Sequence, residues 1–110
     1  MAYDEALAER IRDLLAPRAA VTERKMFGGI GFMVGGNMAC GVSSTSELIV
    51  RPGPEDYERA LGEPGARAFD LSGRPMKGWV LVEAGAVASE DELAGWVDAG
   101  ADFAASLPPK

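Results

Sequence analysis

The amino-acid sequence predicts an α+β fold: a two-layer sandwich of a mostly antiparallel, five-stranded sheet with helices on one face. Two observations predict it. Apolar residues recur at helical spacing near both ends of the chain and at every second position in much of the segment between. The links between the early strand segments have hairpin length, and such links join antiparallel strands. We expect the order α-β-β-β-α-β-β-α in a single domain, residues 1–110.

The first element is expected to be a helix. Its apolar residues are spaced three and four apart and charged residues fill the other positions, as in a helix that buries one stripe. Pro17 disfavours helical backbone at the residue before it, so Ala16 is the expected last helical residue. The stripe consists of Tyr3, Leu7, Ile11, Leu14 and Leu15.

The next two segments are expected to form a β-hairpin. A three-residue loop, residues 35–37, keeps both apolar sets on one face of the sheet. A two-residue loop would instead set Phe32 opposite Ala39 and turn the apolar side chains of the second strand away. We therefore expect the three-residue loop, in which glycine or asparagine takes positive φ. The expected pairs are Val34 with Met38, Phe32 with Cys40 and Ile30 with Val42.

Three further strands and a short helix follow. Strand patterns cover residues 47–51, 66–71 and 77–83, and a short helix begins near Pro54, a residue suited to a first helical turn. The last of these strands is apolar on both sides, with Trp79 and Leu81 on one face and Val80 and Val82 on the other. Such a strand is expected to be central in the sheet or covered by a partner.

The final helix has the clearest start signal. Ser89 and Glu92 form a capping box ahead of an apolar stripe. Gly95 and Gly100 each weaken this helix by about 1 kcal/mol relative to alanine, so packing must hold it. The stripe consists of Leu93, Trp96, Val97, Phe103, Ala104 and Leu107.

Helices on one face leave the other face of the sheet open. The early-hairpin residues expected there are small or flexible, so another chain can approach closely. They are Gly31, Met33, Ala39 and Gly41. We expect a homodimer through this face or along a sheet edge.

Composition and charge narrow the class of protein. The chain has 110 residues, 47% of them hydrophobic and 25% charged, as in an ordinary globular protein. Its net charge of −6 argues against direct nucleic-acid binding, which needs clustered positive charge. A single cysteine excludes an intramolecular disulfide, and the acidic start Met1–Glu5 is unlike a secretory signal. No apolar run is long enough to cross a membrane, so we expect a cytoplasmic protein.

Four segments carry a family resemblance: residues 24–29 (RKMFGG), 36–41 (GNMACG), 73–79 (GRPMKGW) and 107–110 (LPPK). Together they resemble the TfoX N-terminal domain family, from about Tyr3 to Lys110. The resemblance implies an α+β domain related to the type III secretion chaperone-like fold. Longer relatives in γ-proteobacteria regulate natural competence, acting on transcription with the cyclic-AMP receptor protein, and carry a second, helical domain. This chain stops at Lys110, so we expect it to lack that domain. The resemblance implies no catalytic residues.

One candidate site is a group of basic residues near strand ends. If those ends converge, the group forms a positive spot for a phosphate, a carboxylate or an acidic partner segment. The alternative, which we favour, is that they are solvated edge charges that pair with Glu23, Glu47, Asp70 or Glu83. The candidate partner- or anion-binding residues are Arg24, Lys25, Arg51, Arg74 and Lys77.

Three other features have simple structural explanations. The glycines at 28, 29 and 31 match no nucleotide-binding motif and favour a bend between two strand segments. Cys40 is expected to be a buried small hydrophobe. Met26, Met33, Met38 and Met76 suggest a soft-metal site or a pliable peptide groove, although core filling is the favoured interpretation.

The chain is poorly equipped for catalysis. It contains no histidine, so neither a general base near pH 7 nor a Ser–His or Cys–His pair can be built. We expect no catalytic residue, no metal and no cofactor. The expected function is a non-enzymatic regulatory or protein-interaction module with an unidentified protein partner. The alternative is a small-molecule or anion sensor that uses the basic residues.

Overall fold

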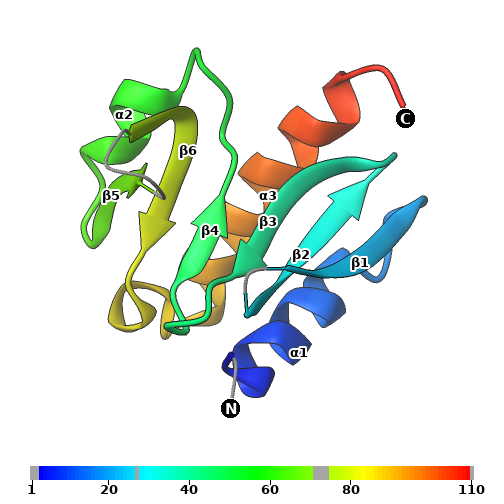
Figure 1. Cartoon of the computed structure of the whole chain (residues 1–110), viewed down its shortest axis with the longest axis horizontal. Coiled ribbons are helices and arrows are strands. Elements are labelled where there is room, and N and C mark those ends of the chain that lie inside the picture. Colours follow the sequence, from blue (N-terminus) through cyan, green and yellow to red (C-terminus); the bar gives the residue numbers. More distant parts are fainter. Residues whose placement is uncertain (1–2, 27, 71–74, 110) are drawn as a thin grey trace.

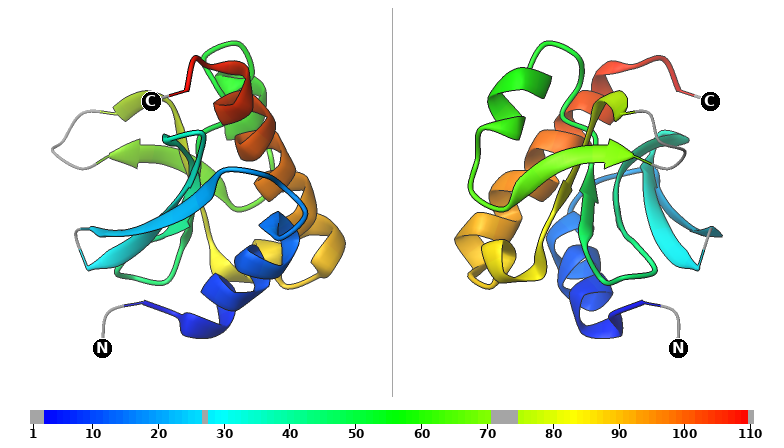
Figure 2. Two further views of the ribbon diagram at one scale, coloured as in Figure 1. Left: turned by 90° about the vertical axis from the view of Figure 1, so that its right-hand side faces the viewer. Right: turned by 60° about the vertical axis from the view of Figure 1, so that its left-hand side comes forward.

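The computed structural model describes residues 3–26, 28–70 and 75–109. It contains an antiparallel sheet with the strand order β1-β2-β3-β4-β6-β5, and the helices cover one of its faces (Figures 1 and 2). The predicted α+β class, the antiparallel sheet and the one-sided helical layer are confirmed. The elements in chain order are α1 (Glu5–Leu15), β1 (Val21–Met26), β2 (Gly29–Val34), β3 (Asn37–Val42), β4 (Leu48–Val50), α2 (Tyr57–Leu61), β5 (Ala66–Asp70), β6 (Pro75–Val82), η1 (Ala84–Val87) and α3 (Glu90–Ser106).

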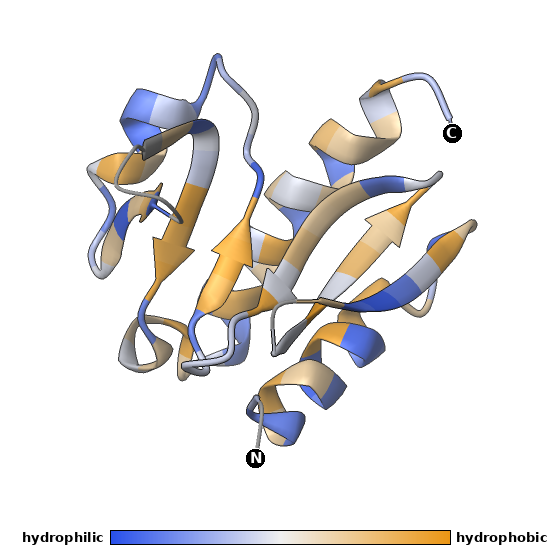
Figure 3. Ribbon diagram, in the orientation of Figure 1, coloured by the Kyte–Doolittle hydropathy of each residue, from blue (hydrophilic) through white to orange (hydrophobic). Residues whose placement is uncertain are grey.

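The predicted count of five strands is wrong, because the described chain forms six. The missed strand is β1, which pairs along its whole length with β2, from Val21 opposite Val34 to Met26 opposite Gly29. Its four middle residues are all exposed, and Figure 3 shows the middle of β1 as hydrophilic. An edge strand can carry charges on both faces, so it lacks the alternation by which a strand is recognised in a sequence.

The β2–β3 hairpin has the predicted register near its base but not at its tip. Phe32 lies opposite Cys40 and Ile30 opposite Val42, as expected. At the tip, Val34 lies opposite Asn37 and the loop contains only two residues, Gly35 and Gly36. Both have positive φ, 60° and 84°, as a tight hairpin turn requires. A shift in register between Phe32 and Met33 reconciles the two halves.

This shift corrects the position predicted for Ala39. Met38 pairs with Met33 and Cys40 with Phe32, so Ala39 is the extra residue of a β-bulge. Ala39 is fully buried in the core, and its carbonyl lies against α3. It therefore faces the helices and not the open side of the sheet. The loop is one residue shorter than predicted, and the extra residue in the bulge makes up the difference, so Phe32 still pairs with Cys40.

The core lies between the sheet and the helices, and side chains cap the first turns of α1 and α3, the latter as the sequence predicts. The Asp4 carboxylate accepts from the backbone N–H groups of Ala6 and Leu7, at 2.9 and 3.2 Å. The Ser89 hydroxyl accepts from the N–H of Glu92 at 3.2 Å. The largest fully buried side chains come from both layers, among them Phe32, Ile11, Leu15, Leu48 and Leu93. The inner side of the sheet is therefore sealed by the chain itself.

Candidate functional site

The face of the sheet that points away from the helices carries a second cluster of apolar side chains. These side chains line a cavity, which we call the trough. Figure 2 shows the β1–β2 and β5–β6 pairs projecting from this face on either side of it. The cavity lies between them and has a volume of about 200 Å³. Its lining is largely apolar, with Ser43 and Ser44 at one side, and includes Met26, Met38, Ile49, Phe69, Met76 and Trp79.

Strand alternation explains why these side chains share a face. In β4, Leu48 and Val50 are part of the core, so Ile49 between them points the other way. In β6, Val80 and Val82 are part of the core, and Trp79 and Leu81 take the opposite side. The sheet is therefore apolar on both faces at its centre. The prediction of a central strand for β6 is confirmed, since it lies between β4 and β5.

Two glycines lie beneath the methionines of the trough. A Cβ atom on Gly41 would lie 2.4 Å from the carbonyl oxygen of Ile30, so only glycine fits there. A Cβ atom on Gly31 would meet the methyl groups of Met26, Met38 and Met33 at 3.2, 3.2 and 3.3 Å. The small-residue surface expected on this face is thus covered by the chain's own methionines.

The four candidate interface residues are not all on this face. Gly31 and Gly41 lie under the methionine methyl groups, and Met33 contributes one of those groups. Ala39 faces the helices instead, as described above. The structure describes one chain, so the homodimer stays a prediction.

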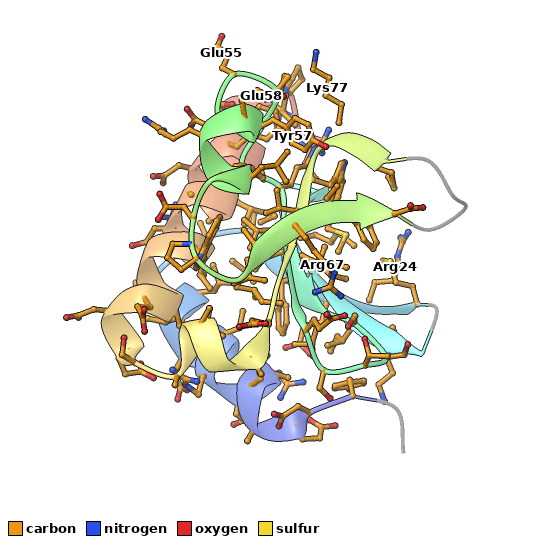
Figure 4. The ribbon with its side chains drawn as sticks, turned by 90° about the vertical axis from the view of Figure 1, so that its left-hand side faces the viewer. Arg24, Glu55, Tyr57, Glu58, Arg67 and Lys77 are labelled. Atoms are coloured by element: carbon orange, nitrogen blue, oxygen red, sulfur yellow. The ribbon has the colours of Figure 1, made fainter. Side chains whose placement is uncertain are left out.

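Two arginines lie over the trough. Arg24 of β1 is opposite Gly31 and exposed, and Arg67 of β5 is opposite Leu81, so alternation puts both on the open face. Figure 4 shows their side chains pointing into the space between the two projecting pairs of strands. Arg67 pairs with the half-buried carboxylate of Glu47. Burial alone would raise the pKa of Glu47, but hydrogen bonds from Thr45 and Arg67 and the charge of Arg67 together lower it.

Arg51, just after β4, is held between two aromatic rings. Its guanidinium carbon lies 5.2 Å from the ring centroids of both Trp79 and Phe103, a distance at which cation–π attraction is significant. Trp79 in turn packs against Phe69, with centroids 6.2 Å apart. A positive charge is thereby fixed beside the apolar lining of the trough.

The candidate basic residues do not converge on one spot. Arg24 and Lys25 are neighbours in β1 and point to opposite faces of the sheet, since Lys25 pairs with the inward-facing Ile30. Figure 4 shows Lys77 at the top of the view near α2, well apart from Arg24. Arg51 is held between its two rings, and Arg74 lies outside the described residues.

Two of the four carboxylates expected to pair with these residues have other partners. Glu23 accepts from Arg12 of α1 at 2.7 and 2.9 Å, and Glu47 pairs with Arg67. Within the described ranges, Arg24, Lys25, Arg51 and Lys77 form no ion pair. The expected pairing with nearby acids is therefore wrong for the described members of the group, whereas Arg24, Lys25 and Lys77 are exposed, as solvated edge charges would be.

The sequence pattern points to Met26, Met38 and Met76 as groove candidates and to Trp79 as part of one apolar face of its strand, but it does not place Ile49 and Phe69 beside them. Ile49, Phe69 and Trp79 sit on strands that pair only in the folded sheet. The two-sided hydrophobicity of β6 is the signal that points to them.

Cys40 is buried as expected, and burial raises the pKa of its thiol to about 12. Across the described ranges, no three cysteine, aspartate or glutamate side chains gather closely enough to hold a metal ion.

A model of the TfoX N-terminal domain matches residues 13–104, which is most of the chain. The chain belongs to the TfoX N-terminal domain family. The match includes every strand of the sheet and hence the whole lining of the trough, and this family is associated with regulation of competence.

No curated protein and no solved structure matches this member of the TfoX N-terminal domain family. Among the residues described, none of the helices has the length and apolar character needed to cross a membrane.

Proposed function

We propose that this TfoX N-terminal domain is a non-enzymatic regulatory module of the cytoplasm that docks a protein partner in the trough. The observation that carries the proposal is the second apolar face of the sheet. Met76 is a large hydrophobic residue that is 37% exposed, and it lies beside the half-buried Met26, Phe69 and Trp79 in one cavity. A contiguous apolar patch at the surface is typical of an interaction site.

The size and lining of the cavity favour a polypeptide partner over a metabolite. A volume of about 200 Å³ is below the range of about 300–1,000 Å³ typical of small-molecule sites. It suits one or two large side chains of a docked segment, the usual anchors of protein interfaces. Methionines adapt to such anchors because their unbranched chains repack easily. The sensor alternative has less support, because it needs the basic residues in one place.

The test is capture of partners by the purified domain from extract of the cells that encode it. The variant Met38→Gln with Met76→Gln makes the trough polar without adding charge. The control Ala105→Gln places the same amide on the exposed face of α3. We expect the wild type and the control to retain the same proteins and the trough variant to lose them, with equal melting temperatures.

Two outcomes would contradict the proposal. One is that all three proteins capture the same partners. The other is turnover of a substrate that a single substitution abolishes while folding is preserved.

A further inference from the structure

We infer that the trough binds an acidic polypeptide segment anchored by a bulky apolar side chain. This inference rests on the proposed function and adds the chemistry of the partner. It depends on how charge is divided between the two layers of the molecule.

Acidic residues are concentrated on the helical layer. Of the 17 acidic residues, 13 lie in α1, α2 and α3 or in the residues that flank them (4–15, 55–63 and 89–106), and these ranges contain only three of the 11 basic residues. The strands and loops hold the remaining eight basic and four acidic residues. Of these, Arg18 pairs with Asp98 and Asp102 of α3. The helical layer is therefore strongly negative, whereas the described strands and their adjoining loops carry a small positive charge, with five basic residues (Arg24, Lys25, Arg51, Arg67 and Lys77) and four acidic ones. This division orients an acidic partner toward the sheet.

The positive charges beside the trough are available to a partner. Arg24 stands over Gly31 and makes no ion pair with any described residue. Arg51 is held by Trp79 and Phe103, and its described contacts include no carboxylate. Glu47, the half-buried acidic residue on this face, is already engaged by Arg67. A carboxylate next to an apolar anchor would therefore meet unpaired guanidinium groups, which bind carboxylates with two hydrogen bonds.

A second copy of this chain fits the trough less well. A two-fold dimer through this face would join two copies of the same surface, so Arg24 and Arg51 of one protomer would face a surface that carries the same unpaired arginines. Like charges across an interface oppose binding. An acidic segment has the complementary charge.

The neighbours Arg24 and Lys25 provide a matched pair of variants. Arg24→Glu and Lys25→Glu make the same change in net charge on the same exposed strand, but only Arg24 faces the trough. The probe is a display library of random twelve-residue peptides selected on the wild-type domain. A selected peptide is then synthesised together with a version in which every Asp and Glu becomes Asn or Gln.

The selected peptides are expected to contain Phe, Leu, Ile, Met or Trp flanked by Asp or Glu. Arg24→Glu should weaken binding about tenfold or more, and Lys25→Glu should leave it unchanged. The amide version of the peptide should bind the wild type as weakly as the acidic peptide binds Arg24→Glu.

Other results would contradict either the acidic chemistry of the partner or the docking function itself. Neutral or basic peptides, or equal effects of the two glutamate variants, would overturn the acidic partner while the docking function stands. The absence of any selected peptide, or binding that survives Met38→Gln with Met76→Gln, would overturn the docking function as well. If light scattering gave a dimeric mass, and Arg24→Glu changed that mass whereas Lys25→Glu did not, the occupant of the trough would be a second copy of this chain.

Discussion

At the scale of the residue, burial decides the chemistry of Cys40. Its side chain is fully buried among the core residues of the sheet and helices, and burial raises its thiol pKa from 9.0 to about 12. At pH 8 this lowers the fraction of reactive thiolate about a thousandfold. In the native protein we expect a disulfide reagent to label Cys40 only as fast as the protein unfolds. In denaturant we expect rapid labelling. The absorbance of the thiol released from the reagent measures both rates. Fast labelling of the native protein would contradict the buried position.

The ion pair between Arg12 and Glu23 joins α1 to β1 and makes stability depend on pH. The Arg12 hydrogen bond lowers the pKa of Glu23 below its ordinary value of 4.5, against a smaller effect of burial. A carboxyl whose pKa is lower in the folded state stabilises the fold above pH 4.5, and this contribution disappears as the pH falls through the folded-state pKa. Glu23 is 39% exposed, so solvent screening limits the contribution to less than about 1 kcal/mol.

Denaturant unfolding of Glu23→Gln checks this prediction. The variant should be less stable than the wild type at pH 7, and the difference should shrink as the pH drops below 4.5. A difference that stays constant down to pH 2 would show that the ion pair is not its source.

At the scale of the element, the two glycines of α3 have opposite roles. A Cβ atom on Gly95 would meet nothing within 4 Å, whereas one on Gly100 would lie 2.3 Å from the carbonyl oxygen of Ala39. We expect Gly95→Ala to stabilise the protein by about 1 kcal/mol through helix propensity. Gly100→Ala should destabilise it by about 1–3 kcal/mol, because α3 must move away from β3. Thermal unfolding measures both, and shifts of the same sign would refute this packing.

The β2–β3 hairpin shows which parts of an element its sequence can specify. The pairing of Phe32 with Cys40 follows from alternation, because a slip by one residue would expose the apolar set. The bulge at Ala39 could not be predicted, because two arrangements set Phe32 opposite Cys40. One is a two-residue loop with a bulge, and the other is a three-residue loop with a regular strand. Packing of Gly100 against the Ala39 carbonyl selects between them only in the folded protein. Strand β1 was missed for a different reason: its charged middle residues carry no strand pattern.

At the scale of the whole molecule, the trough exists because strands distant in sequence pair with each other. Leu48 of β4 lies opposite Val82 of β6. In the sheet β6 lies between β4 and β5, although β5 precedes β6 in the chain. This arrangement puts Phe69 and Trp79 on the same face as Met26 and Met38. The sequence indicates four methionines with no histidine or second cysteine and a strand apolar on both sides. The sequence does not indicate that these methionines and this strand come together in one cavity, because that depends on the order of strands in the sheet. The uneven distribution of charge likewise appears only once helices and sheet occupy separate layers.

The methionine lining makes the trough sensitive to oxidation. Peroxide converts thioethers into sulfoxides, which are polar. The methyl groups of Met26, Met33 and Met38 converge over Gly31, and Met76 is exposed beside them, so sulfoxide oxygens there would replace an apolar floor by a hydrated one. The thiol of Cys40 is sealed on the other side of the same sheet and is protected. Oxidative stress would therefore act first on the trough and leave the core intact.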